Sequence, residues 1–179
     1  MTVSALAKIL CLVSGIFGRP AWEAAKCDER ASMLSEAAEG HHLDPLLLVA
    51  IDVVECDLGV EDAKFRENGR VAGIDACPMG VRLRGRINRE DYPPPVLYEI
   101  AAKRLDDARR RCRGRRCRGH FVSMYNWGNR DYAAEVLAVA AALGSKSLGR
   151  RATARSLPQR IAGIVRKIAT SMKRAEDRT

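Results

Sequence analysis

The amino-acid sequence predicts a mainly α-helical, single-domain protein built around one buried helix. Hydrophobic residues make up 47% of the 179 residues, which is enough for one sizeable core at this length. Aromatic residues account for only 5%, while Ala, Leu and Arg, which are strong helix formers, are abundant. The sequence contains no strictly alternating runs of β-branched residues. We therefore expect no large sheet.

Residues 1–25 contain a short apolar run, residues 9–17. This run is too short to cross a bilayer, which takes about 20 residues, and no other segment is apolar enough to do so. We interpret residues 1–25 as a signal peptide cleaved near residues 21–25. The alternative is a first amphipathic helix of the mature fold. The remaining domain then spans residues 26–179.

Six cysteines support export, because disulfides form and persist in oxidising compartments. We therefore expect a periplasmic or secreted protein. A small Cys112–Cys117 loop and a Cys56–Cys77 bridge both fit the spacing, although the sequence leaves the pairing open. Removal of Cys11 with a signal peptide would leave one cysteine unpaired. A zinc site is disfavoured, since no C-x-x-C pair or suitably spaced His is present.

The helices can be placed from their boundary signals. A first helix is expected over residues 21–39, ending near Gly40. Asp44 is a good N-cap, and Pro45 suits the first position of the next helix. This helix is apolar on nearly all sides, so we expect it to be central and buried. Residues 58–95 hold five glycines and three consecutive prolines, so we expect an irregular, functional segment that can include short strands. Further helices are expected over residues 96–111, 120–127, 131–143 and 156–174, with a basic loop over residues 112–119.

Three separated segments carry a family resemblance. They are LDPLLLVAIDVVEC (residues 43–56), GIDACPMGVRL (residues 73–83) and SMYNWGNRDYAAEVL (residues 123–137). Their order resembles the lytic transglycosylases, in which an Asp-Pro-start helix ends in Glu-Ser and is followed by Gly-Leu-Met-Gln and Tyr-Asn-x-Gly motifs. The resemblance covers roughly residues 28–143. It departs from the pattern at Cys56, which replaces the Ser, and at Leu83, which replaces a Gln that lines the sugar groove.

The resemblance implies a lysozyme-like (SLT-type) domain that cleaves the bond between N-acetylmuramic acid and N-acetylglucosamine in peptidoglycan. Glu55 would act first as general acid and then as base on the C6 hydroxyl, which yields a 1,6-anhydro sugar without metal or cofactor. The substrate-binding residues would be Tyr125, Asn126, Met79, Gly80, Trp127 and Asp75. The partners would be peptidoglycan glycan strands and a cell-envelope assembly.

The helix context gives Glu55 a chemical rationale. A carboxyl at the end of an apolar helix is partly desolvated, which raises its pKa and keeps it protonated as an acid requires. The negative end of the helix dipole acts in the same direction. The neighbouring Asp52 and Asp57 would add to the shift if they are ionised.

Three other functions remain open. Asp75 could serve as the second carboxylate of a hydrolytic lysozyme. The changes at Cys56 and Leu83 would fit an inactive module that binds glycan. A net charge of +9 would suit a nucleic-acid-binding helical protein, but the cysteines and the lack of a DNA-binding motif argue against nucleic acid as the partner.

Overall fold

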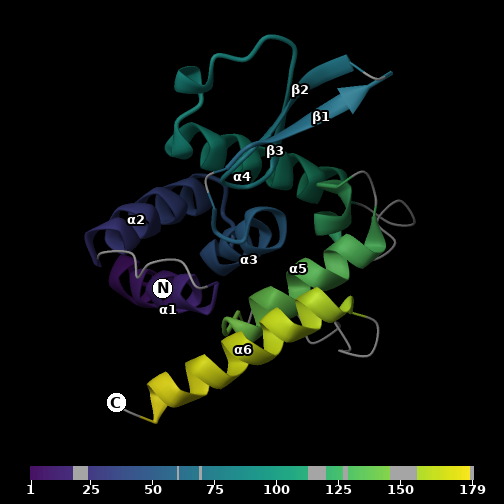
Figure 1. Ribbon diagram of the computed structural model, residues 1–179. Coiled ribbons are helices and arrows are strands. Elements are labelled where there is room, and N and C mark those ends of the chain that lie inside the picture. Colours follow the sequence, from purple (N-terminus) through teal and green to yellow (C-terminus); the bar gives the residue numbers. More distant parts are fainter. Residues whose placement is uncertain are drawn as a thin grey trace.

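Helix α3 (Pro45–Cys56) lies at the centre of the fold (Figure 1). The computed structural model describes residues 1–17, 24–59, 61–68, 70–112, 120–126, 129–145 and 157–177. The described ranges contain five further α-helices: α1 (Val3–Ile16), α2 (Ala24–Gly40), α4 (Pro94–Arg111), α5 (Arg130–Ala142) and α6 (Gln159–Glu176). The prediction of a mainly helical protein with a central buried helix is confirmed.

The start and the burial of α3 follow directly from its sequence. The Asp44 carboxylate accepts the backbone N–H of Leu46 at 2.9 Å, and Pro45 occupies the first turn, where a missing N–H costs nothing. Every residue from Leu46 to Val54 is buried. The helix ends at Asp57, which adopts a left-handed conformation with φ of 48°. Glu55 therefore lies near the C-terminal end of the most buried helix.

Helix α1 packs against α2 and α6, and the Cys11–Cys27 disulfide joins α1 to α2. Its Leu6, Leu10 and Val13 are fully buried. Removal of residues 1–25 would therefore uncover this part of the core and leave Cys27 without Cys11. Cleavage of a signal peptide stays a prediction. No helix in the described ranges is long and apolar enough to cross a membrane.

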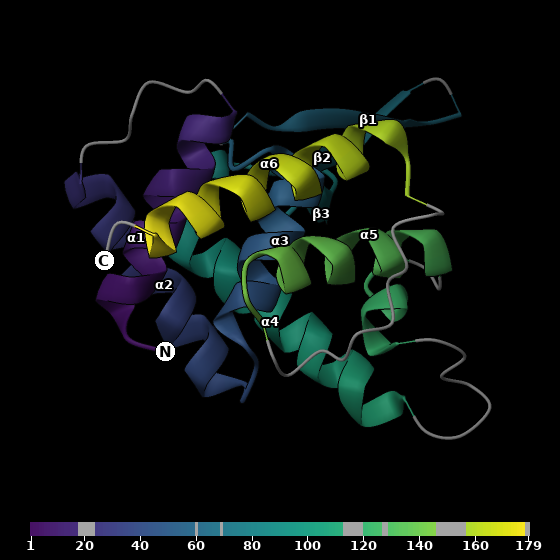
Figure 2. The same ribbon diagram turned by 90° about the horizontal axis from the view of Figure 1, so that it is seen from below.

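Helices α5 and α6 run side by side on the other flank of α3 (Figure 2). Helix α5 contacts α3 directly, whereas α6 packs on α5 and α1. Residues 121–124 form only a short 3-10 helix, η3 (Phe121–Met124), in place of the helix predicted over residues 120–127. Residues 113–119, which make up most of the predicted basic loop and include Cys117, lie outside the described residues. Cys112 is disulfide-bonded.

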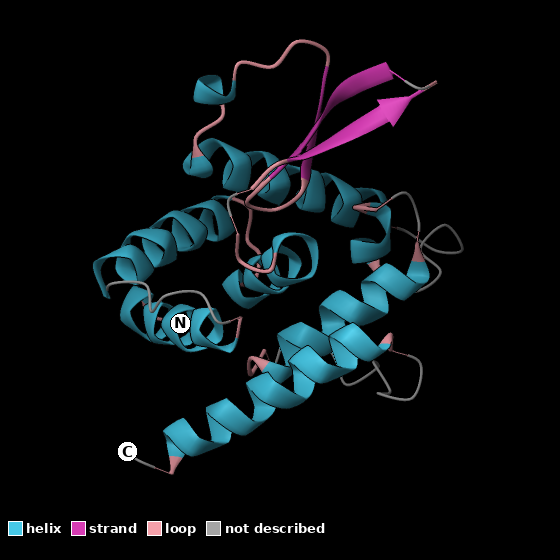
Figure 3. Ribbon diagram, viewed as in Figure 1, coloured by secondary structure: helices cyan, strands magenta, loops and turns pink. Residues whose placement is uncertain are grey.

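The segment predicted to be largely irregular contains a three-stranded antiparallel sheet (Figure 3). Its strands are β1 (Ala63–Glu67), β2 (Arg70–Ala76) and β3 (Val81–Arg84), in that order across the sheet. Short strands were allowed for in this segment, but their positions could not be predicted because β1 and the start of β2 are mostly exposed and carry no apolar alternation. Gly73 permits the pairing, since a Cβ there would lie 2.0 Å from the Leu83 carbonyl oxygen. The 3-10 helix η1 (Arg89–Asp91) then leads to α4.

A buried ion pair connects α3 to the helices beside it. Arg30 of α2 pairs with Asp52 of α3, and the Asp52 side chain is fully buried. Arg30 also donates to the carbonyl oxygen of Leu58 at 2.9 Å and to the hydroxyl of Tyr98 on α4. Burial raises the pKa of the Asp52 carboxyl, and Arg30 opposes that shift. The pair joins three helices behind the carboxylate end of α3.

We expect Asp52→Ala to lower the free energy of unfolding by about 3–5 kcal/mol, because it leaves the Arg30 guanidinium buried without its counter-charge. Denaturant unfolding with the disulfides intact would measure this loss. Asp57→Asn is the matched control, since Asp57 pairs with Arg160 where both side chains are roughly half exposed, and Asn tolerates the left-handed backbone conformation of this position. Its expected loss is about 0–1 kcal/mol. Equal losses in the two variants would contradict a structural role for the buried pair.

Candidate active site

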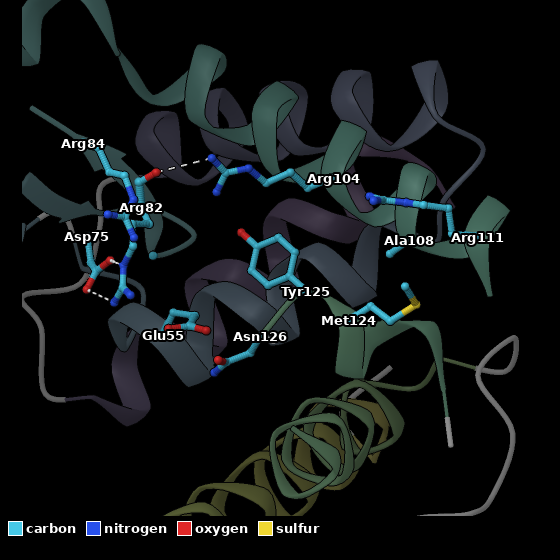
Figure 4. A pocket seen from close by; sticks show the side chains of 11 residues that line it. Glu55, Asp75, Arg82, Arg84, Arg104, Ala108, Arg111, Met124, Tyr125 and Asn126 are labelled. Carbon is cyan, nitrogen blue, oxygen red and sulfur yellow. Dashed lines mark hydrogen bonds and ion pairs between the residues drawn. The ribbon is translucent and has the colours of Figure 1, made fainter. Parts of the chain in front are cut away.

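A pocket of about 470 Å³ opens at the C-terminal end of α3. It lies between the sheet, α4 and the segment around η3 (Figure 4). The side chains that line it come from all of these elements: Glu55, Asp75, Gly80, Arg82, Arg84, Arg104, Ala108, Arg111, Met124, Tyr125 and Asn126. Two acidic and four basic residues therefore share one cavity.

Glu55 is held in place by the segment between β2 and β3. A Cβ added at Gly80 would lie 2.8 Å from Glu55 Oε2 and 2.9 Å from Glu55 Cβ, so only glycine fits against the carboxyl. Gly80 also has a positive φ of 58°, which glycine adopts without strain. The Cys56–Cys77 disulfide fastens this segment to the end of α3, as the sequence spacing allowed. Both the backbone contact and the covalent link thus fix the position of Glu55.

The surroundings of Glu55 favour the protonated acid. Its carboxyl is accessible from the pocket, but neighbouring protein atoms remove part of its hydration, and this desolvation raises its pKa. The negative charges of Asp75 and Glu135 raise the pKa further. The Tyr132 hydroxyl, as a hydrogen-bond donor, and the positive charge of Arg82 lower it. The net effect is a raised pKa, as predicted from the helix context.

The acidic neighbours differ from those predicted. Asp52 is one turn away on α3 but is buried behind the site and paired with Arg30. Asp57 pairs with Arg160 on α6. The residues that raise the Glu55 pKa are instead Asp75 from β2 and Glu135 from α5. The tertiary fold, which brings these strands and helices together, therefore determines the shift.

Two tyrosines stand beside Glu55. The Tyr125 hydroxyl donates to the Met79 carbonyl oxygen at 3.0 Å, which ties the segment after η3 to the residue before Gly80. Tyr132 stacks on Tyr125 with ring centroids 6.4 Å apart. Its buried hydroxyl faces Glu55 but makes no hydrogen bond of good geometry. Burial, followed by the Glu55 charge, raises the pKa of both tyrosines, so both hydroxyls keep their protons. The Tyr125 proton is engaged by the Met79 carbonyl, and the Tyr132 proton remains available.

Asp75 is engaged by an arginine at the same end of the pocket. Arg82 Nε lies 2.8 Å from Asp75 Oδ1, and Arg82 Nη2 lies 3.1 Å from Asp75 Oδ2, which makes the ion pair bidentate (Figure 4). The Arg82 guanidinium also stacks over the Phe65 ring, 4.5 Å from its centroid. Both Asp75 oxygens thus already accept protein donors.

Most of the residues predicted for the site do meet in this pocket. Glu55, Asp75, Gly80, Tyr125 and Asn126 all line it. Met79 is fully buried and contributes its backbone carbonyl rather than a pocket surface. Leu83, where the resemblance would have placed a Gln, is turned into the core. Trp127 lies outside the described residues.

The sequence did not indicate the arginines of the pocket or the role of Tyr132. Arg82 and Arg84 lie on β3, whose position was not predicted, and Arg104 and Arg111 lie on α4, which was expected only as a helix over residues 96–111. The spacing of residues 104, 108 and 111 could have shown that they share one face of the helix, because residues three, four and seven apart lie on the same side.

No group of three or more His, Cys, Asp or Glu side chains in the described parts of the chain is arranged to hold a metal ion. No family model matches the sequence, and no curated protein or solved structure shows significant similarity to it.

The electrostatic account of Glu55 predicts opposite shifts in two variants. Asp75→Asn removes a negative charge and frees the Arg82 cation, so we expect the Glu55 pKa to fall. Tyr132→Phe removes a donor to the carboxylate, so we expect the pKa to rise. NMR titration of the Glu55 side-chain carboxyl carbon measures both. Shifts of the same sign in the two variants would refute this assignment of causes.

Proposed function

We propose that the protein is a peptidoglycan lytic transglycosylase with Glu55 as its catalytic acid and base. The observation that carries the proposal is one carboxyl with a raised pKa, open to a pocket and fixed by Gly80 and a disulfide. The lytic transglycosylase pattern in the sequence supports it, since Asp75, Gly80, Tyr125 and Asn126 line the same pocket. The lysozyme-like character of the fold is part of the proposal.

In the proposed reaction, protonated Glu55 donates to the oxygen that links muramic acid to glucosamine. The bond between that oxygen and the muramic C1 breaks, and the glucosamine leaves as an alcohol. The Glu55 carboxylate then takes the proton of the muramic C6 hydroxyl, whose oxygen bonds to C1. Glu55 ends in its original protonated form, and no water is consumed.

The pairing of Asp75 favours this route over hydrolysis. A hydrolytic lysozyme of the usual kind needs a second carboxylate as a nucleophile or to activate water. Both oxygens of Asp75 are directed at Arg82, and the acid has no other acidic partner among the described pocket residues. Asp75 then serves to raise the pKa of Glu55. The disulfides fit a periplasmic or secreted enzyme, where the glycan substrate is found.

Incubation with purified peptidoglycan, followed by mass spectrometry of the released muropeptides, tests the proposal. We expect 1,6-anhydro products from the wild-type protein and at least about a hundredfold less product from Glu55→Gln, because the amide cannot transfer the proton. Unchanged turnover by Glu55→Gln would remove Glu55 from the mechanism. Products with reducing ends would identify a hydrolase, and binding without turnover would identify an inactive glycan-binding module.

We expect Gly80→Ala to reduce turnover by about a hundredfold, because the added Cβ displaces the Glu55 carboxyl. The rate of anhydro-product formation would measure the loss. Gly40→Ala is the matched control, since its Cβ meets no atom within 4 Å and lies at the end of α2. Wild-type turnover in Gly80→Ala would mean that this contact does not position the acid.

A further inference from the structure

One wall of the pocket is a basic face of α4. Arg104, Ala108 and Arg111 all line the cavity, and their spacing places them on one side of the helix. Arg104 and Arg111 lie seven residues apart, which corresponds to about 10 Å along the helix axis. Figure 4 shows Arg104 reaching toward the Arg82 backbone, and Arg111 on the far side of Tyr125 from the Asp75–Arg82 pair. The small Ala108 leaves room between them.

These two arginines differ from the others around them in their partners. Arg82 pairs with Asp75, and Arg84 pairs with Glu67 at 2.6 Å. On the same helix, Arg109 and Arg110 both pair with Asp106. Each of these cations is matched by a carboxylate of the protein.

Arg104 and Arg111 contact only backbone oxygens. Arg104 donates to the Arg82 carbonyl at 3.3 Å, and Arg111 donates to the Asp107 carbonyl at 3.1 Å. Neither has an acidic oxygen within 4 Å among the described residues. A guanidinium has five N–H donors, so each retains several for a ligand. The α4 wall therefore presents two positive charges to the cavity that contains Glu55.

We propose that Arg104 and Arg111 bind a carboxylate of the peptide stem that the substrate carries on its muramic acid. This inference rests on the proposed function. Cleavage at Glu55 brings the muramic acid into the pocket, and the stem is attached to that same sugar. Its carboxylates are the anions that the substrate itself delivers to this wall, and guanidinium groups bind carboxylates through paired, charge-assisted hydrogen bonds.

The cleavage of two forms of one substrate tests the inference. The probes are glycan strands from purified peptidoglycan with their stems intact, and the same strands after an amidase has removed the stems and the lactyl carboxylates exposed by that cleavage have been converted to methyl amides. We expect Arg104→Ala/Arg111→Ala to lower kcat/KM on stem-bearing strands by about tenfold, chiefly through KM, and to lower it on stem-free strands much less.

Lys103→Ala is the matched control, because it removes one positive charge from the exposed surface of the same helix outside the pocket. We expect it to cleave both strand types at the wild-type rate. Arg104→Lys/Arg111→Lys should recover part of the loss, since charge is kept but paired hydrogen bonding is not. Equal losses on both strand types, or no loss on either, would overturn the inference.

A binding measurement separates failure of this inference from failure of the proposed function. Glu55→Gln protein, with and without the two arginine substitutions, is titrated with each strand type. Weaker binding of stem-bearing strands only, in the arginine variant, supports the inference even if the wild-type protein cleaves neither strand. Equal binding by both proteins overturns it. Binding of duplex DNA in preference to both strand types would show that the wall serves a nucleic acid instead, and would also overturn it.

Discussion

The position of the site depends on the buried pair between Arg30 and Asp52. Asp52 lies one turn before Glu55 on α3, and Arg30 also holds the carbonyl of Leu58 just beyond the helix end. The carboxylate turn of α3 is thus fixed from both sides. Tyr98 joins the same network from α4, the helix that forms the arginine wall. Burying two charges is costly, and it is tolerated here because the guanidinium finds partners in three different segments.

The rigid frame gives a single acid its chemistry. Helix α3 is apolar and buried up to Val54. The Cys56–Cys77 disulfide and the close contact at Gly80 hold the segment between β2 and β3 against the end of this helix. Asp75 and Glu135 add negative charge near Glu55, the Tyr132 hydroxyl lies close to it, and both Asp75 oxygens are engaged by Arg82. One carboxyl is left free to exchange a proton with a ligand in the pocket. This division of roles is what single-acid cleavage requires.

Local signals in the sequence were sufficient to predict α3, its Asp44 cap and the exit of Glu55, because capping and burial depend on neighbouring residues. The motif order also indicated that Asp75, Tyr125 and Asn126 lie near Glu55, and all of them line the same pocket. The sequence indicated that residues 58–95 can include short strands but not where these strands lie, since they are short, charged and largely exposed. The partners of each charge could not be predicted, because Arg30 meets Asp52, Arg82 meets Asp75 and Glu135 approaches Glu55 only through tertiary packing.

The central claim is that Glu55 alone completes the reaction, with the sugar's own hydroxyl in place of water. Cleavage of peptidoglycan in water labelled with heavy oxygen tests it most directly. If the claim holds, mass spectrometry will find anhydro-muramic products without the label, and Glu55→Gln will form none of them. Incorporation of one heavy oxygen at the muramic C1 of every product would contradict it, because that oxygen could come only from water attack.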